Sequence, residues 1–360
     1  MREPLRALPS EVDQIPDRPA VFLLRAGAGK PYLARTSLLR RRLKRLLWSP
    51  ERISKVLNLS GLIDRIEYWP TGSQLESSVL FLELAQQYFP SDWQDLTRLR
   101  LPAYVRLTLD NPFPRTHIAT RAGRGLSYGP FLNRASAERF EQELLDLFQV
   151  RRCEESLSPS PDHPGCIYGE MNKCLRPCQE IVSIDEYRSE AVRVEQFLRT
   201  AGASLREPAE AARDRASADM RFEEALQMHQ RVERIREVQA LAGDLARVID
   251  QLHGIAVLPS SEPGAIELWF MAHGSWQDPR RFQPSELSGA GGSLDRQLRE
   301  LAAEIKIRDR AAPNAEHLAI LARWYGSTWR DGEWIGFDSF EKIPYRRLVN
   351  AVGRILKPTS

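Results

Sequence analysis

The sequence predicts an α+β protein made of several small domains, and three observations support this prediction. Apolar runs of strand length alternate with helical periodicity in the first ninety or so residues, and again in the last hundred. Between these parts, residues 184–251 follow an almost continuous helical pattern. A chain of 360 residues is also long enough to bury two or three separate hydrophobic cores.

The pattern at the start of the chain predicts a β-hairpin followed by a helix. Val21–Leu24 is a short apolar run, two glycines supply the turn, and Tyr32 begins the return strand. Thr36 or Ser37 is then expected to cap the helix. Its apolar residues recur at helical spacing, at Leu39, Leu43, Leu46 and Leu47.

A third strand and a second helix complete this first domain, which we place at residues 1–95. The strand is expected around Leu62–Tyr68. The helix is expected from about Gln74 to Tyr88, where Pro90 closes it. The order β-β-α-β-α describes a small mixed domain.

The second predicted domain, residues 96–183, is a connector that leads into a cysteine-rich segment. It contains one strand at 103–109, a turn in GLSYGPFLNRAS and an amphipathic helix at 136–148. Residues 184–252 form a helical third domain. Breaks in this domain are expected near two residues, Gly202 and Pro208.

The last predicted domain, residues 253–360, is again α+β. It has a strand pair at 254–258 and 266–271, a flexible glycine-rich loop at 288–293 and a helix from Leu294. Four aromatic residues lie among arginines near its end: Trp324, Tyr325, Trp329 and Trp334. Such residues can stack on nucleic-acid bases or fill the core of a small domain.

Composition and charge indicate an ordinary soluble protein. The chain is 42% hydrophobic and 28% charged, with a mean hydropathy of -0.41. No run approaches the roughly 18 apolar residues of a membrane span, and the first residues carry acids and prolines where a secretory signal would be apolar. We therefore expect a cytoplasmic location. The net charge of +3 is small, but basic residues cluster between Arg35 and Arg45.

The cysteines are confined to one segment. The chain has four of them, at Cys153, Cys166, Cys174 and Cys178. This number is too small for a secreted disulfide scaffold of this length. In a reducing compartment, such local clustering indicates a zinc or iron–sulfur centre rather than disulfide bridges.

The hairpin and its following helix resemble the GIY-YIG nuclease domain. The two short motifs of that domain correspond to Ala20–Phe22 and Tyr32–Ala34, and Arg42 follows Tyr32 by ten residues, the offset of the family's catalytic arginine. The resemblance implies that Tyr32 activates water and that Arg42 stabilises charge on the phosphate. It also implies a glutamate that binds Mg²⁺ or Mn²⁺.

Two glutamates of the second helix are candidates for that metal ligand. Glu83 ends the run SVLFLE and fits the family's motif best, and Glu76, two turns earlier, is the reserve candidate. Arg35 stands where excinuclease members carry lysine, so it is a further candidate site residue.

Two departures from the GIY-YIG pattern leave an alternative open. Phe22 replaces the tyrosine of the first motif, and Ala34 replaces the glycine of the second. The domain is then either a nuclease or a DNA-contacting fold that does not cut, and a merely solvated basic helix is the third alternative. Its candidate DNA contacts are Arg40, Arg41, Lys44 and Arg45.

The cysteine segment and its surroundings resemble the linker of the UvrC family, the DNA-repair nucleases of the ABC excinuclease system. That linker has a YGPF turn, here 128–131, then an F-x-x-R-x-C helix end, here 148–153, and a C-x-x-P-C element, here 174–178. The resemblance implies a [4Fe–4S] cluster on the four cysteines. Zinc is the alternative, although the spacing lacks the paired C-x-x-C knuckles of common zinc sites.

The helix after residue 220 resembles the UVR motif, through which members of this family bind their excinuclease partner, UvrB. The motif corresponds to Phe222, Glu223 and Ala225. The family's Arg-Asp pair is replaced by His229 and Gln230. An ordinary helical bundle is the alternative.

Taken together, the resemblance implies a DNA-repair endonuclease that makes the 3′ incision of nucleotide excision repair with UvrB. The layout is similar to that of the short excinuclease homologue Cho. A catalytically inactive DNA-binding or adaptor repair protein is the alternative, and a nuclease acting outside excision repair is a third possibility.

Overall fold

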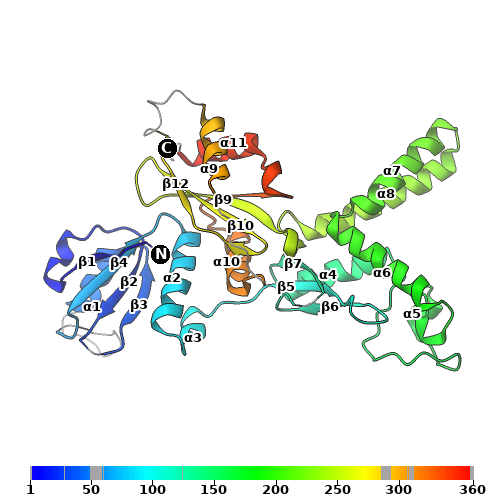
Figure 1. Cartoon of the computed structure of the whole chain (residues 1–360), viewed down its shortest axis with the longest axis horizontal. Helices are drawn as coiled ribbons and strands as arrows, with labels where there is room; N and C mark the ends of the chain where they lie inside the picture. The colour runs from blue at the N-terminus through cyan, green and yellow to red at the C-terminus, as the bar shows by residue number, and fades with distance from the viewer. Residues whose placement is uncertain are drawn as a thin grey trace.

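The computed structural model describes residues 2–27, 29–48, 59, 61–123, 125–284, 293–305, 307 and 312–356. Figure 1 shows three sheets with packed helices along the chain, so the predicted α+β class is confirmed. One sheet belongs to the N-terminal head, one to the middle of the chain and one to the C-terminal part. Within these ranges we find no helix with the length and apolar character that a membrane span requires.

The head sheet consists of antiparallel pairs in the order β1-β4-β2-β3. Its strands are β1 (Leu5–Ala7), β2 (Ala20–Arg25), β3 (Tyr32–Thr36) and β4 (Arg65–Pro70). The predicted hairpin of β2 and β3 is confirmed, and β4 begins slightly later than expected. Strand β1 was not predicted, because three residues carry too little pattern to be recognised before their pairing with β4 is known.

Helix α1 (Leu39–Leu47) covers one face of this sheet, and its leucines pack in a core with β2 and β4. The expected cap at Thr36 or Ser37 is wrong, because neither side chain caps the helix. Asp17, in the loop before β2, instead accepts a hydrogen bond from the backbone N–H of Arg41 at 3.1 Å. A cap supplied from this distance in the chain leaves no local sequence signal.

Helix α2 (Gln74–Tyr88) covers the opposite face, with the bounds predicted from the sequence. Ser73 caps it by accepting the N–H of Glu76 at 3.1 Å. Leu84 and Ala85 pack on the head sheet. Three other residues pack in the core of the C-terminal part: Leu75, Val79 and Leu82. The helix therefore belongs to two cores at once, which explains why apolar residues surround most of it.

The middle sheet has the order β6-β5-β7-β8. The short helix α3 (Trp93–Thr97) precedes this sheet in the chain. The strands of the sheet are β5 (Ala103–Leu107), β6 (Thr116–Ala119), β7 (Leu126–Phe131) and β8 (Arg247–Val248). The YGPF segment was expected to be a turn, and this is wrong: it lies within β7, which contains a cis Gly129–Pro130 peptide. Its partner β8 comes from far along the chain, so this pairing was not visible locally.

Helix α4 (Arg134–Leu145) follows β7 and is capped by Asn133, whose side chain accepts the N–H of Ser136 at 2.8 Å. The cysteine segment contains only two short helical turns, α5 (Ile167–Glu170) and a 3-10 helix at Pro177–Gln179. It packs beside α4 and the next helix, so it forms an irregular lobe of the middle part (Figure 1).

The helical region comprises three helices, α6 (Ile184–Arg199), α7 (Ala203–Ala218) and α8 (Phe222–Ala242). The predicted break near Gly202 is confirmed, and this glycine has a φ of 88°. The break predicted at Pro208 is wrong, since Pro208 lies inside α7. Pro208 lies beyond the first turn of α7, so the helix lacks the hydrogen bond to the carbonyl of Ser204, and packing against α8 offsets that loss. The second break falls instead at residues 219–221.

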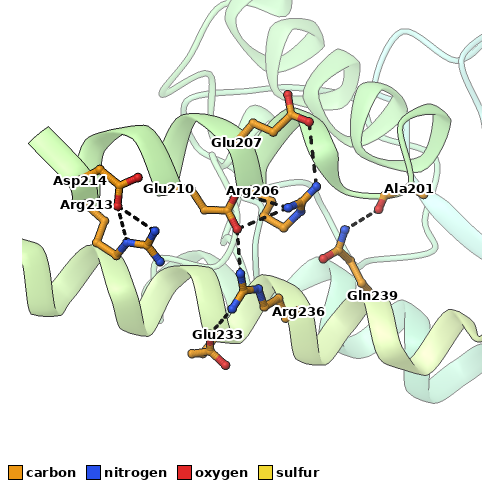
Figure 2. A network of polar contacts seen from close by, with 9 residues as sticks. All are labelled: Ala201, Arg206, Glu207, Glu210, Arg213, Asp214, Glu233, Arg236 and Gln239. Carbon is orange, nitrogen blue, oxygen red and sulfur yellow. Dashed lines mark hydrogen bonds and ion pairs between the residues drawn. The ribbon is translucent and has the colours of Figure 1, made fainter.

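Helices α7 and α8 form an antiparallel hairpin that projects from the middle part (Figure 1). Figure 2 shows the polar contacts that join them. Glu210 on α7 accepts hydrogen bonds from Arg206, at 3.2 Å, and from Arg236 on α8, at 2.9 Å. Gln239 donates to the carbonyl of Ala201 in the turn before α7. Arg236 and Gln239 thus join α8 to α7 and to the turn before it. Arg206 holds Glu210 in place within α7.

The C-terminal sheet has the order β11-β10-β9-β13, and β12 also pairs with β10. Its strands are β9 (His253–Pro259), β10 (Ile266–Ala272), β11 (Ser275–Trp276), β12 (Arg280–Phe282) and β13 (Glu333–Phe337). The predicted strand pair is confirmed as β9 and β10. Most of the glycine-rich loop predicted at 288–293 lies outside the described residues.

Helices cover both faces of this sheet. Helices α9 (Leu294–Ala303) and α11 (Tyr345–Leu356) pack on one face, and the predicted helix from Leu294 is thereby confirmed. Helix α10 (Ala315–Tyr325) packs on the other face together with α2 of the head. The head and the C-terminal part therefore share an apolar core.

We expect Leu82→Ala to lower the free energy of unfolding by about 2–5 kcal/mol, because Leu82 is only 1% exposed in that shared core. Denaturant unfolding of the whole chain measures this change. Gln86→Ala, at an exposed position of the same helix, is the control and should change it by less than about 0.5 kcal/mol. Equal stability of the two variants would contradict the shared core.

Candidate functional site

Tyr32 and Arg42 lie together on the α1 face of the head sheet. Arg42 donates from Nη2 to Tyr32 Oη across 3.4 Å, and both side chains are partly exposed. The ring centre of Tyr32 is 6.2 Å from that of Phe22. Within the described part of the chain, no carboxylate forms a hydrogen bond or ion pair with either Tyr32 or Arg42. A phenol and a guanidinium are thus paired here without a metal ligand.

The two departures from the GIY-YIG pattern are neighbours in the structure. Phe22 on β2 pairs with Ala34 on β3. Phe22 is completely buried, and Ala34 packs against the same core. Phe22 therefore packs in the core of the head. Of the aromatic residues in the two motifs, Tyr32 is the one that remains partly exposed to solvent.

Arg35 points to the other face of β3 and contacts α2. It donates from Nη1 to Ser78 Oγ at 2.7 Å, and its guanidinium carbon is 5.6 Å from the ring centre of Phe81. Burial, followed by the charge of Arg323, lowers the pKa of Arg35. The side of α2 that meets β3 therefore presents a hydroxyl and an aromatic ring to this arginine, and no carboxylate.

The two candidate metal ligands lie on a different side of α2. Glu76 and Glu83 are seven residues apart, so they share one face of the helix, opposite the face that carries Ser78. Both line a cavity of about 290 Å³ with Trp69 of β4 and Asp278 of the C-terminal part. Strand β2 separates β4 from β3. The structure thus brings Tyr32 and Arg42 together but places the glutamates across the sheet from them.

A buried charge network fixes Glu76. This carboxylate accepts the N–H of Gly72 at 2.7 Å and a hydrogen bond from Arg2 at 3.0 Å. Arg2 also pairs with Glu267 of β10 at 2.6 Å, and Glu267 is completely buried. Burial raises the pKa of Glu76 to about 7. The network ties α2 to the C-terminal sheet, and sequence reasoning missed Arg2 and Glu267 because no local motif marks them.

The positive charge of α1, the candidate DNA-contacting helix, is only partly neutralised by nearby acidic residues. Arg40 donates to the carbonyl of Asp13 at 3.4 Å, and Lys44 forms an ion pair with the Asp13 carboxylate. Arg41 and Arg45 are exposed, and neither side chain forms an ion pair with a described residue. A carbonyl does not neutralise Arg40, so Arg40, Arg41 and Arg45 all keep their positive charge on α1, with no ion pair to a described residue.

The four cysteines converge on one small cavity, and none forms a disulfide. The N–H of Arg176 points at Cys174 Sγ from 3.4 Å, and Arg151 Nη1 lies 3.7 Å from Cys153 Sγ. Burial, with a smaller contribution from the other cysteines, raises the pKa of Cys174 to about 11, although the hydrogen bond from the Arg176 N–H acts in the opposite direction. Burial also raises the pKa of Cys178.

These surroundings fit a soft metal centre, because thiols with raised pKa values ionise readily only when a cation offsets their charge. Hydrogen bonds to sulfur and nearby arginines stabilise the anionic ligands. Among the residues that the structure describes, no three histidine, cysteine, aspartate or glutamate side chains already stand in the arrangement of a bound metal ion. Both the metal centre and its identity therefore stay predictions.

Arg151 anchors the cysteine segment to the middle part. It is 2% exposed and donates to the carbonyls of Phe113 at 3.0 Å and Glu155 at 2.7 Å. Its own N–H donates to Tyr187 Oη on α6 at 2.9 Å, and this hydroxyl donates to the carbonyl of Pro114. A single buried arginine thus orders the loop beside the thiols, a role that the linker motif alone did not indicate.

The predicted partner-binding residues lie at the free end of the α7–α8 hairpin. Phe222 is 70% exposed, and two further apolar residues, Met220 and Leu226, are exposed beside it. Glu223 is exposed and Ala225 is partly buried. Exposed apolar groups gathered at the end of a rigid hairpin are typical of a protein-binding surface.

Comparison with known proteins gives one family match and many relatives. Residues 103–198 match the family described as "UvrC/Cho excinuclease, middle domain". They span β5 to α6 and include all four cysteines. UvrABC system protein C of Dehalococcoides mccartyi (strain CBDB1) is 26% identical over 278 residues, which are 75% of this chain and 45% of that protein. The same protein of Rickettsia africae (strain ESF-5) is 26% identical over 247 residues, 68% of this chain and 38% of its own length.

The chain is therefore UvrC-like over most of its length, as the linker and helical motifs predicted. It spans less than half the length of these curated relatives. No solved structure matches it.

The raised pKa of Glu76 predicts a pH-dependent loss of stability. A carboxyl whose pKa is raised on folding stabilises the protein below about pH 4.5, and this contribution is lost as the pH rises through about 7. We expect wild type to lose up to about 3 kcal/mol relative to Glu76→Gln between pH 5 and pH 8. Denaturant unfolding at several pH values measures this difference, with Glu223→Gln as the exposed control. Parallel pH profiles of wild type and Glu76→Gln would refute it.

Proposed function

We propose that this chain acts in nucleotide excision repair as a DNA-binding adaptor that UvrB recruits, and that its GIY-YIG-like head does not cut DNA. The proposal rests on the similarity to UvrABC system protein C and on the arrangement of the head. A cytoplasmic location is part of it.

One observation carries the non-cutting part. Metal-dependent cleavage needs a carboxylate that holds the metal ion close to the groups acting on the phosphate. Here Glu76 and Glu83 face a cavity beside β4, while Tyr32 and Arg42 lie on the α1 face. The α2 residues that contact Arg35 of β3 are Ser78 and Phe81. The exposed arginines of α1 can contact DNA phosphates without a metal ion.

The hairpin supports recruitment by UvrB. The residues that correspond to the UVR motif lie at the exposed end of the α7–α8 hairpin, whose helices are joined by the contact between Arg236 and Glu210. Phe222 is the apolar residue best placed to enter a pocket on a partner. His229 and Gln230 are also exposed, so the motif's missing Arg-Asp pair does not reflect a different packing of α8.

For the cysteine site we propose a [4Fe–4S] cluster, with zinc as the alternative. Cys153, Cys166, Cys174 and Cys178 would be the ligands, and Arg151 and Arg176 would stabilise their charge. A cluster at this place would act structurally, because it would join the irregular loop to α4 and α6.

A specific observation also favours a second function, 3′ incision. The 3.4 Å contact between Arg42 and Tyr32 preserves two of the three groups that a GIY-YIG nuclease requires. In this alternative Glu83 supplies the Mg²⁺ or Mn²⁺ ligand, and α2 moves to bring it to the pair. Arg35 would then assist at the phosphate.

The two functions are distinguished by incubating the purified chain with UvrB and a lesion-bearing duplex in Mg²⁺ or Mn²⁺. We expect binding to UvrB and to DNA but no nick, and unchanged binding in Tyr32→Phe and Glu83→Gln. Phe222→Ala should weaken UvrB binding at least about tenfold, because an exposed aromatic anchor is lost. Ile181→Ala, another exposed apolar residue, is the control. A 3′ nick that Arg42→Ala abolishes would establish the second function instead.

The cluster proposal predicts that protein purified without oxygen is brown and contains about four iron atoms and four sulfides per chain. Cys174→Ala should lose most of this iron, and Ser160→Ala in the same segment should keep it. Elemental analysis and visible absorption measure both. A colourless protein with one zinc ion would support the alternative, and the absence of both metals would refute a metal centre.

A further inference from the structure

An arginine-lined groove lies where α3, the connector that follows it and α10 meet. Its volume is about 590 Å³, and Arg98, Arg100 and Arg323 line it. This volume falls within the range of roughly 300–1,000 Å³ that is typical of small-ligand sites. All three side chains are exposed. None of them belongs to the groups discussed above for cutting, metal binding or UvrB recruitment.

The groove continues toward the head through a smaller cavity. Thr97 and Arg323 line both cavities, and Arg35 and Trp329 line the smaller one. The row of side chains thus runs from Arg98 and Arg100, past Arg323, to β3. It joins three parts of the molecule that α2 and α10 hold together (Figure 1).

The positive charge of this row is uncompensated. Neither cavity has an aspartate or glutamate in its lining. Arg98 donates to the carbonyl of Asp95 at 3.2 Å, but within the described ranges none of the four arginines forms an ion pair. Arg206 and Arg236 of the α7–α8 hairpin, by contrast, are both paired with Glu210. The charge of Arg323 also contributes to the lowered pKa of Arg35, as expected for neighbouring cations.

An exposed tryptophan stands beside these cations. Trp329 is 47% exposed, whereas Trp324 and Trp334 are buried in the shared core. From the sequence, these aromatic residues could either fill a core or stack on bases. Their burial distinguishes the two roles: Trp324 and Trp334 fill the core, and Trp329 stays accessible. Arg330 lies 4.9 Å from the ring centre of Tyr325, which adds a cation and a second ring next to Trp329 in the chain. A half-exposed indole beside arginines can stack on an unpaired base.

We propose that this groove binds a short segment of single-stranded DNA. Arg98, Arg100 and Arg323 contact successive phosphates, and one base stacks on Trp329. The proposal deepens the DNA-binding part of the proposed function and rests on it. A volume of about 590 Å³ is that of a small-ligand site, which suits one or two nucleotides of a single strand. An acidic peptide would match the arginines but would leave the indole unused, so the tryptophan favours a nucleic acid.

Fluorescence anisotropy of a labelled oligothymidylate, titrated with the full chain in EDTA at several salt concentrations, tests the proposal. Arg98→Ala/Arg100→Ala should lower affinity at least about tenfold. It should also reduce the slope of log affinity against log salt by about 1.4, since each phosphate contact to a single strand contributes about 0.7. Trp329→Ala should weaken binding about 5- to 150-fold without changing the slope, because it removes a stacked base.

Arg188→Ala/Arg346→Ala is the matched control, since it removes two exposed arginines outside the groove that form no ion pair with a described residue. It should bind like wild type. Groove variants that bind as tightly as this control would overturn the proposal. Displacement of the oligonucleotide by polyglutamate at the same concentration of negative charge would also overturn it. The titration contains neither UvrB nor a metal ion, so loss of recruitment or of nicking does not affect this result. A chain that binds duplex but no single strand would refute the groove and leave the adaptor function standing.

Discussion

The packing of helix α2 between the head sheet and the C-terminal core fixes the direction in which each of its side chains points. Leu84 and Ala85 face the sheet, while Leu75, Val79 and Leu82 face the tryptophans of the C-terminal part. Two narrow sides remain. One carries Glu76 and Glu83, and the other carries Ser78, next to Phe81 at the edge of the sheet-facing side. Rotating the helix to exchange these sides would expose both apolar faces, at a cost of several kcal/mol.

This constraint links the chemistry of the head to the C-terminal part. Glu76 is held by Arg2, which also binds Glu267 of β10, so the glutamate side of α2 is occupied by a structural ion network. The opposite side borders the cavity that Arg35 and Trp329 line. The head therefore keeps a Tyr32–Arg42 pair and cationic surfaces, and no carboxylate among its described residues forms a hydrogen bond or ion pair with either residue. This combination suits DNA contact better than metal-dependent cleavage.

Features with a local signal were predictable from the sequence. Apolar periodicity and the positions of glycines predicted the β2–β3 hairpin, helix α2, the β9–β10 pair and the break at Gly202. The linker and hairpin motifs also pointed to the UvrC-like relatives. Features that depend on distant partners were not predictable. Asp17 caps α1 from another loop, the YGPF segment forms a strand between β5 and the distant β8, and the burial of α2 directs Glu83 away from Tyr32.

The most direct test of the central claim is the position of a bound metal ion. Anomalous diffraction from crystals of the chain grown with Mn²⁺ locates the ion relative to Tyr32 and Arg42. The account predicts no Mn²⁺ within coordination distance of a carboxylate beside this pair. A Mn²⁺ ion held by Glu83 next to Tyr32 Oη would contradict it, because α2 would then have to leave the position that its two cores impose.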